Sequence, residues 1–244
     1  MNAIEENIYT ESWKELGASL AKPRAILMFS AHWITEGHTS ISTATDLDMI
    51  YDMYGFPPPL YAVKYPAKWD PILAREIYDS LRNAGINIEK DPTRGLDHGE
   101  WSVLCHMFPD ADTPVVSISL DYTLLRARYL DIGRALAPLR ESGVLIMWSG
   151  NIVHNLRAID WTDLQIFPWA SDFDRKVTDN ITSRAFANII DFDSWKETNM
   201  AHPSVDHFLP LLPLLGAVNP EDQVSFLTPE ITMGSLAMRS VVWE

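Results

Sequence analysis

The segment that decides the fold is Arg24-Ala-Ile-Leu-Met-Phe-Ser-Ala-His-Trp33. It follows Pro23 and runs through five consecutive apolar residues before it reaches the histidine. A short apolar run without alternation predicts a strand that is buried on both faces, which is typical of a parallel sheet covered by helices. Two further segments read as strands, Pro114-Val-Val-Ser-Ile-Ser-Leu120 and Gly143-Val-Leu-Ile-Met-Trp-Ser149.

Helical patterns lie between these strands. Asp70 followed by Pro71 is a helix start signal, and Gly85 ends that helix. Further helices are predicted over 8–20, from Asp121 to about Glu141 and over 171–191, and shorter strands near 39–43, 86–89 and 239–243. No repeat or Gly/Ser-rich linker divides the chain. The pattern predicts an α/β fold, a single domain with a largely parallel central sheet and helices on both faces.

Composition argues against several classes of protein. The net charge of −14 disfavours binding to nucleic acid or to an anionic membrane surface. No apolar run reaches the roughly 18 residues of a membrane span, and the acidic start of the chain has no signal-peptide pattern. Cys105 is the only cysteine, so no internal disulfide can form, and a reducing cytoplasmic setting is expected.

Seven histidines carry the functional signal through their positions. His32 follows the first buried strand and His154 follows the strand at 143–149, so both are expected at the carboxyl edge of the sheet, where α/β proteins bind ligands. His98 follows a glycine-bearing turn, and His207 lies in a proline-rich segment. The other three look like ordinary loop or helix residues: His38, His106 and His202.

For any one histidine alone, a hydrogen-bonded structural role is the more frequent one, and spacing leaves both interpretations open. The chain has no HExxH, CxxC or GxGxxG motif and no GxSxG serine elbow. Neither an organic-cofactor site nor a serine nucleophile is therefore indicated. A site built from histidines that lie far apart in the sequence is the leading chemical hypothesis.

Four segments carry a resemblance to a known family: Ser30-Ala-His-Trp33, Gly95-Leu-Asp-His-Gly-Glu-Trp101, Ser149-Gly-Asn-Ile-Val-His-Asn-Leu156 and His207-Phe-Leu-Pro-Leu-Leu212. They resemble the signature segments of the LigB-like, DODA-type branch of the class III extradiol ring-cleavage dioxygenases, and they occur in the family order. Other segments extend the resemblance over nearly the whole chain, among them Met1-Asn-Ala-Ile-Glu-Glu-Asn7 and Gly234-Ser-Leu-Ala-Met238.

The resemblance implies a metal-dependent enzyme that opens a catechol ring with O₂, with Fe(II) for activity or Zn(II) as the bound metal. It implies that His32 and His207 are metal ligands and that His98 is a catalytic residue for proton transfer and substrate positioning. It implies that His154 is a catalytic acid/base that also approaches the metal when no substrate is bound. The implied partners are O₂ and a catechol-type substrate, with a DOPA-like compound among the candidates.

Neighbouring side chains have expected supporting roles. Asp97 or Asn155 is expected to orient the imidazoles through hydrogen bonds. Tyr54, Trp33 and Trp101 are candidates for the wall on which the substrate ring stacks, with core packing as the alternative for each. The oligomeric state is open, and a homo-oligomer is compatible with the sequence.

The chain departs from the family pattern at its start. A histidine in a Gly-His-Gly-Ser-Pro-like segment normally precedes the stretch that matches Met1-Asn-Ala-Ile4, so the domain over 1–244 is expected to lack the family's first strand and one ligand. A misassigned start, a shortened chain and a natural variant remain alternatives. Loss of a ligand predicts weak metal binding, with His38 or Asp206 as substitute ligands. Two other functions stay open, a zinc-dependent hydrolase on the same fold and a metal-poor, inactive relative.

Overall fold

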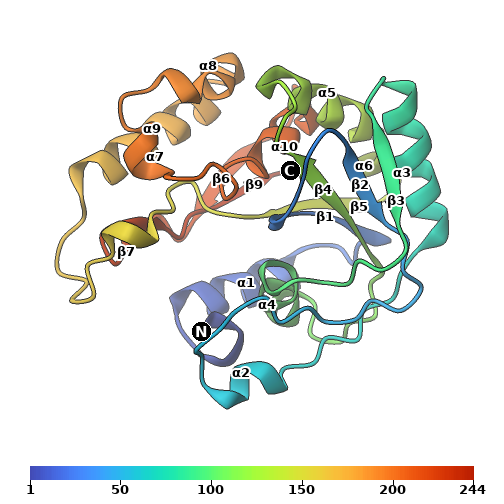
Figure 1. The fold of residues 1–244 in the computed structure, drawn as a ribbon, viewed down its shortest axis with the longest axis horizontal. Helices are drawn as coiled ribbons and strands as arrows, with labels where there is room; N and C mark the ends of the chain where they lie inside the picture. The colour runs from blue at the N-terminus through green and yellow to red at the C-terminus, as the bar shows by residue number, and fades with distance from the viewer.

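The computed structural model describes all residues 1–244 and has a five-stranded central sheet in the order β3-β2-β4-β1-β5 (Figure 1). Its strands are β1 (Ala25–Thr35), β2 (Thr39–Ser42), β3 (Ile88–Asp91), β4 (Val115–Asp121) and β5 (Val144–Ser149). β1 pairs in parallel with both β4 and β5, and β2 pairs in parallel with β3. Only the contact of β2 with β4 is antiparallel. The expected largely parallel sheet is confirmed.

Helices cover both faces of this sheet, as expected (Figure 1). Alternate residues of β1 enter two separate hydrophobic clusters. Leu27 and Phe29 pack with residues of α3 (Pro71–Asn83), α5 (Arg126–Leu136) and α10 (Leu211–Ala217). Ile26 and Met28 face the other way and share a cluster with Trp101 and Leu104 of α4 (His98–Met107). The apolar run that predicted β1 is buried on both sides because each face has its own core.

The remaining elements complete the layers around the sheet. α1 (Ile8–Ser19) packs on α4, and α6 (Pro138–Glu141) lies against β5. The short helices are η1 (Asn2–Ile4), α2 (Pro58–Ala62), η2 (Leu156–Ala158), α8 (Phe186–Ile190), η3 (Phe192–Ser194) and α9 (Thr198–Ala201). β6 (Val224–Leu227) pairs with β9 (Ser240–Trp243), and β7 (Ile231–Thr232) pairs with β8 (Leu236–Ala237). The expected last strand therefore forms, but outside the central sheet.

Two helix boundaries differ from the sequence-based prediction. Asp121 does not cap a helix, because it is the last residue of β4 and its carboxylate accepts the backbone N–H groups of Gly37 and Thr123. The helix expected over 171–191 is instead α7 (Pro168–Thr182) followed by α8. The break lies at Arg184, whose φ of 57° is left-handed and cannot continue a helix.

A bulge in β1 places the first histidine of the site. Phe29 pairs with Ile118, and the register with β4 resumes only at Ile34, which pairs with Leu120. Five steps along β1 thus span two steps of its partner. Such an irregularity bends a strand and redirects side chains out of the pleat. His32 lies within this stretch and leaves the sheet at its carboxyl edge.

The two outermost strands of the sheet are β3 on one side and β5, next to β1, on the other. Of β5 only Val144 is fully buried. The expectation that the domain lacks a family strand stays a prediction. None of the helices is long and apolar enough to cross a membrane.

Candidate active site

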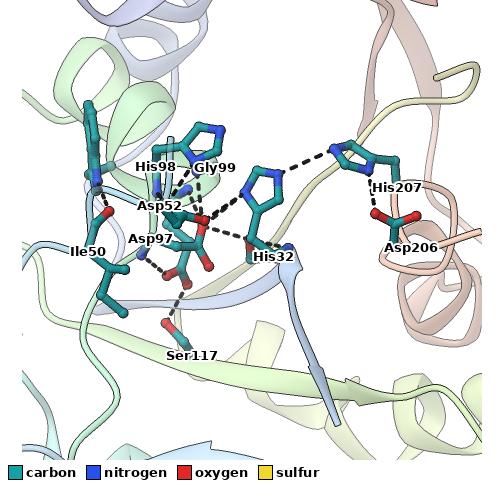
Figure 2. Close-up of polar contacts among 12 residues, drawn as sticks. His32, Ile50, Asp52, Asp97, His98, Gly99, Ser117, Asp206 and His207 are labelled. Carbon is teal, nitrogen blue, oxygen red and sulfur yellow. Dashed lines mark hydrogen bonds and ion pairs between the residues drawn. The ribbon is translucent and has the colours of Figure 1, made fainter. Parts of the chain in front are cut away.

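His32 and His207 face each other at the carboxyl edge of the sheet (Figure 2). Their Nε2 atoms are 3.3 Å apart, although the residues are 175 positions apart in the chain. His32 comes from the bulge of β1, and His207 comes from the turn between α9 and α10. Both rings are largely withdrawn from solvent, with 21% and 13% of their side-chain surface exposed.

A carboxylate stands behind each of these two rings. The Nδ1 atom of His207 lies 2.9 Å from a carboxylate oxygen of Asp206. Burial alone would raise the pKa of Asp206, but the hydrogen bonds from His207 and Ser204, together with the charge of His207, outweigh burial and hold that pKa well below its usual range. The Nδ1 atom of His32 lies 3.5 Å from Asp97. The acceptor at His207 favours a proton on Nδ1 and leaves its Nε2 with a free lone pair, whereas His32 Nδ1 has an anionic neighbour but no hydrogen bond.

His154 extends the cluster on the other side of His207. The two rings are parallel, with centroids 3.5 Å apart and an angle of 3° between the planes. His154 follows β5, and its backbone N–H donates to the carbonyl of Ala201. Burial, followed by the neighbouring His207, lowers the pKa of His154 to about 3. Its imidazole is therefore neutral at physiological pH in the metal-free protein.

His98 completes the cluster on the side of His32. It is the first residue of α4, and its ring stacks on His32 with centroids 4.2 Å apart and an interplanar angle of 22°. Asp97 caps the helix by accepting the backbone N–H groups of Gly99 and Glu100. Gly99 permits this close approach, because a Cβ there would lie 2.9 Å from His32 Nδ1.

Asp52 is a further member of the site that the sequence did not reveal. Its Oδ1 lies 2.8 Å from His98 Nδ1, and its Oδ2 lies 3.7 Å from His32 Nδ1. Burial would raise the pKa of Asp52, but the hydrogen bonds from His98 lower it to about 2. Asp52 lies in the irregular segment between β2 and α2, where no periodicity or motif distinguishes one acidic residue from the next.

Two carboxyl groups are fully buried beneath the site. Asp97 and Glu100 have no exposed surface, and Ser30 and Arg94 donate to Asp97. Glu100 accepts the backbone N–H of Asp97 at 3.0 Å and lies 2.5 Å from the Ser117 hydroxyl. Burial, with the negative charge of Asp97, raises the pKa of Glu100 well above its usual range. This direction favours the protonated form of Glu100, which belongs to the network that supports the start of α4.

The donor atoms of this cluster suit a metal ion. Metal–nitrogen bonds of about 2.0–2.1 Å place two adjacent ligand nitrogens roughly 3.0–3.4 Å apart, and the Nε2 atoms of His32 and His207 are separated by 3.3 Å. At this distance the two nitrogens form a hydrogen bond if one of them carries a proton, and if neither does, they can bind one cation together. A second set of donors shares His32: it consists of His32, Asp52 and His98, whose ligand atoms all lie within 4.8 Å of one another.

All four histidines singled out in the sequence thus form one row: His98, His32, His207 and His154. The other three lie elsewhere. His38 is near Glu89, His106 contacts the carbonyl of Asn2, and His202 contacts the carbonyl of Ile152. His38 is therefore not placed to substitute for a ligand, and Asp206 lies behind His207, engaged with its Nδ1.

Of the two alternative orienting residues, Asp97 lies 3.5 Å from His32 Nδ1 without a hydrogen bond to it, and Asn155 bonds only to the backbone. Asn155 accepts the backbone N–H of Arg157 and donates to the carbonyl of Met200. Its side chain organises the turn after His154 rather than the imidazole. Asn155 does not orient an imidazole because its side chain caps η2, where it accepts the backbone N–H of Arg157.

A cavity of about 170 Å³ opens beside His98. Trp101 borders it but is fully buried in the core cluster, which fits the alternative of core packing. The other side chains around it are mostly apolar, including Trp13, Met53, Phe56 and Leu60. Trp33 is buried under the guanidinium of Arg94, and Tyr54 is 90% exposed, so neither lines this cavity. A larger cavity of about 380 Å³ runs along β5 and β9 and includes none of the four histidines.

A comparison with protein families gives one match over most of the chain. A family model described as "Catalytic LigB subunit of aromatic ring-opening dioxygenase" matches residues 4–238.

Individual relatives agree with it. The chain is 39% identical over 248 residues to 4,5-DOPA dioxygenase extradiol of Escherichia coli, an alignment that covers 99% of this chain and 90% of the relative. It is 37% identical over 224 residues to 4,5-DOPA dioxygenase extradiol of Beta vulgaris, covering 90% and 82% of the two chains. Among solved structures, the crystal structure of the uncharacterized Escherichia coli protein JW3007 superposes with a TM-score of 0.83, at 36% identity, over 98% of this chain and 93% of that one.

Proposed function

The chain belongs to the LigB family of aromatic ring-opening dioxygenases and is an extradiol catechol dioxygenase; we propose that His32 and His207 hold its metal ion while His98 and His154 move protons. The observation that carries this assignment is the 3.3 Å separation of the two Nε2 atoms. Each of these atoms belongs to a ring whose Nδ1 faces a carboxylate. The two Nε2 atoms are thus close enough to share one ion.

We prefer this pair as the metal site over the set of His32, Asp52 and His98. Asp52 Oδ1 is already engaged by the backbone N–H and the Nδ1 of His98. His32 would also have to bind through Nδ1, the nitrogen that faces Asp97. The Nε2 atoms of His32 and His207, by contrast, contact only each other. We propose that His154, stacked on His207, supplies a further nitrogen when no substrate is bound.

Fe(II) is the proposed metal for activity, and Zn(II) also suits imidazole donors. A ferrous ion held here would act as a Lewis acid toward both catechol oxygens and provide positions at which O₂ reacts. Overall, one ring C–C bond beside the diol breaks, and both atoms of O₂ enter the product.

The protein's own contribution is to bind, orient and exchange protons. Catechol must lose its hydroxyl protons before both oxygens can bind a metal. His154 is neutral and has no carboxylate partner, so its imidazole is placed to accept a proton and return it later. His98 lies at the opposite end of the row, beside the cavity, and is proposed to serve the other face of the substrate ring.

The cavity next to His98 supports a small aromatic substrate. Its wall contains Phe56, an exposed ring against which a flat substrate can stack, and it adjoins the row of histidines at His98. The relatives' names make a catechol with an amino-acid side chain, such as DOPA, the first compound to test. The single cysteine supports a reducing cytoplasmic setting for the enzyme.

Neither alternative raised by the sequence is favoured. The relatives are dioxygenases by name. The test is to load the protein with Fe(II) and supply catechols and O₂. The proposal expects consumption of O₂ and substrate in equal amounts and a coloured product. Turnover without O₂ in the zinc-loaded protein, and none on catechols, would instead support the hydrolase.

A further inference from the structure

Asp52 makes two hydrogen bonds to one residue, and that residue is His98. Asp52 Oδ1 accepts the backbone N–H of His98 at 3.0 Å and lies 2.8 Å from His98 Nδ1. Figure 2 shows Asp52 beneath the His98 ring and beside His32. No other carboxylate is within hydrogen-bonding distance of the His98 ring.

The backbone bond has a structural reason of its own. His98 is the first residue of α4, and the first N–H groups of a helix have no partner within the helix. Asp97 satisfies the N–H groups of Gly99 and Glu100 but not that of His98. Asp52 therefore supplies the missing acceptor, and its negative charge is favoured at a helix N-terminus.

The side-chain bond determines the state of the imidazole. An ionised carboxylate can only accept, so the proton must lie on Nδ1 of His98. In the neutral ring Nε2 is then the unprotonated nitrogen, the one left to exchange a proton with a substrate in the adjacent cavity. The same bond fixes the ring angle at which His98 stacks on His32.

The segment that carries Asp52 is held in place although it has no regular structure. The backbone N–H of Ile50 donates to the carbonyl of Leu96 at 2.7 Å. The indole N–H of Trp101, on α4, donates to the carbonyl of Ile50 at 3.1 Å. The hydroxyl of Tyr51 donates to the carbonyl of Val63 at 2.7 Å. Asp52 thus sits next to a backbone pinned to the same helix that it caps, as precise positioning requires.

We propose that Asp52 is the positioning residue of His98: it fixes the Nδ1–H tautomer and the orientation of the ring, so that Nε2 is the nitrogen offered to the substrate. This role rests on the proposed function only in taking His98 as a proton-transfer residue. The tautomer itself is a property of the metal-free protein and can be measured without turnover.

The direct test is ¹⁵N NMR of the histidine rings in the metal-free protein, with the His98 signals identified by their loss in His98→Gln. The expected result is an Nδ1–H tautomer for His98 in the wild type and in Asp52→Asn, whose amide oxygen still accepts. Asp52→Ala is expected to shift His98 toward Nε2–H. Asp48→Ala, an exposed acidic residue of the same segment, is the matched control and leaves the His98 signals unchanged.

Kinetics supply the second readout. With Fe(II) and catechol, Asp52→Ala is expected to lower kcat roughly 10–100-fold, with a smaller change in KM and substantial rescue in Asp52→Asn. In the His98→Gln background, Asp52→Ala is expected to cost almost nothing further, because the two residues act as a unit.

Several results would overturn the proposal. One is an Nε2–H tautomer of His98 in the wild type, which needs no variant at all. Another is an unchanged His98 signal in Asp52→Ala. An equal loss of kcat in the presence and absence of His98 would assign Asp52 a merely structural role. If instead the wild type does not open catechols while the tautomer still depends on Asp52, the proposed function fails and the positioning role stands.

Discussion

His32 and His207 direct their Nε2 atoms at each other across 3.3 Å, and each ring has a carboxylate behind its Nδ1. The first strand of the chain, β1, and a turn near the end of the chain each contribute one of the two residues. This relationship explains why two residues so distant in sequence belong to one centre. The row of histidines and the buried groups that support it have consequences that can be measured.

Removal of either proposed ligand is expected to weaken metal binding strongly. His32→Ala and His207→Ala each lose one of few nitrogen donors, so affinity for Zn(II) or Fe(II) is expected to fall by about 100-fold or more. Calorimetric titration of the apo-protein measures this. His38→Ala is the control, since His38 lies beside Glu89 and away from the row. Unchanged affinity in both ligand variants would exclude the assigned pair.

Asp206 is expected to matter through His207. Asp206→Asn keeps the size of the side chain but removes the charge that favours the Nδ1–H form of His207. The expected loss of metal affinity is about 10–100-fold, smaller than that of His207→Ala. Because the folded-state pKa of Asp206 is lowered, its charge stabilises the apo-protein at neutral pH, so the thermal midpoint should also fall in this variant. An affinity loss as large as that of His207→Ala would instead make Asp206 a ligand.

His154→Ala distinguishes two roles for one residue. If His154 acts in proton transfer, kcat falls roughly 10²–10⁴-fold while metal content is retained. If it is chiefly a ligand, metal is lost together with activity. Metal analysis of the purified variant and a rate measurement at saturating Fe(II) separate the two. Full activity would remove His154 from the mechanism.

Glu100 is expected to make stability depend on pH. Its folded-state pKa is raised, so above the unfolded pKa of roughly 4.3 the unfolded chain gives up a proton that the folded protein keeps. Stability contributed by this group is therefore lost as pH rises toward the folded pKa. Glu100→Gln can donate to Ser117 and accept from Asp97 without ionising.

The variant should thus gain stability relative to the wild type as pH rises from 5 to 8. Urea denaturation at several pH values measures the difference. Glu15→Gln, an exposed residue of α1, is the control and should show no such trend. A constant difference between Glu100→Gln and the wild type across this range would mean that Glu100 is ionised in the folded protein.

Much of the fold could be read from local sequence. The apolar run at 24–30 became β1, which is buried on both faces, and the run at 143–149 became β5, which lies at the edge of the sheet and is only partly buried. The start of α3 was clear from Asp70 and Pro71, and Asp70 indeed caps it. The boundaries that failed are those set by tertiary contacts. Asp121 resembles a cap in isolation, but it is drawn into bonds with Gly37, which lies 84 residues away.

The histidines of the site could be selected, but their partners could not. Strand ends and family motifs pointed to His32, His98, His154 and His207, which the structure brings together. Asp52 gave no signal, because its role arises only when an irregular segment folds against the start of α4. Asp97, by contrast, lies in a motif of the family and directly precedes His98, so the sequence did indicate it as a supporting residue.

The central claim is that the His32–His207 pair holds the metal at which a catechol ring is opened. The most direct measurement is the mass of the product formed from a catechol and O₂ by the Fe(II)-loaded protein, compared with the His32→Ala/His207→Ala double variant under the same conditions. The account predicts a product with the mass of the catechol plus both atoms of one O₂, formed by the wild type only. Unchanged catechol or a quinone from the wild type, or the same ring-opened product from the double variant, would contradict it.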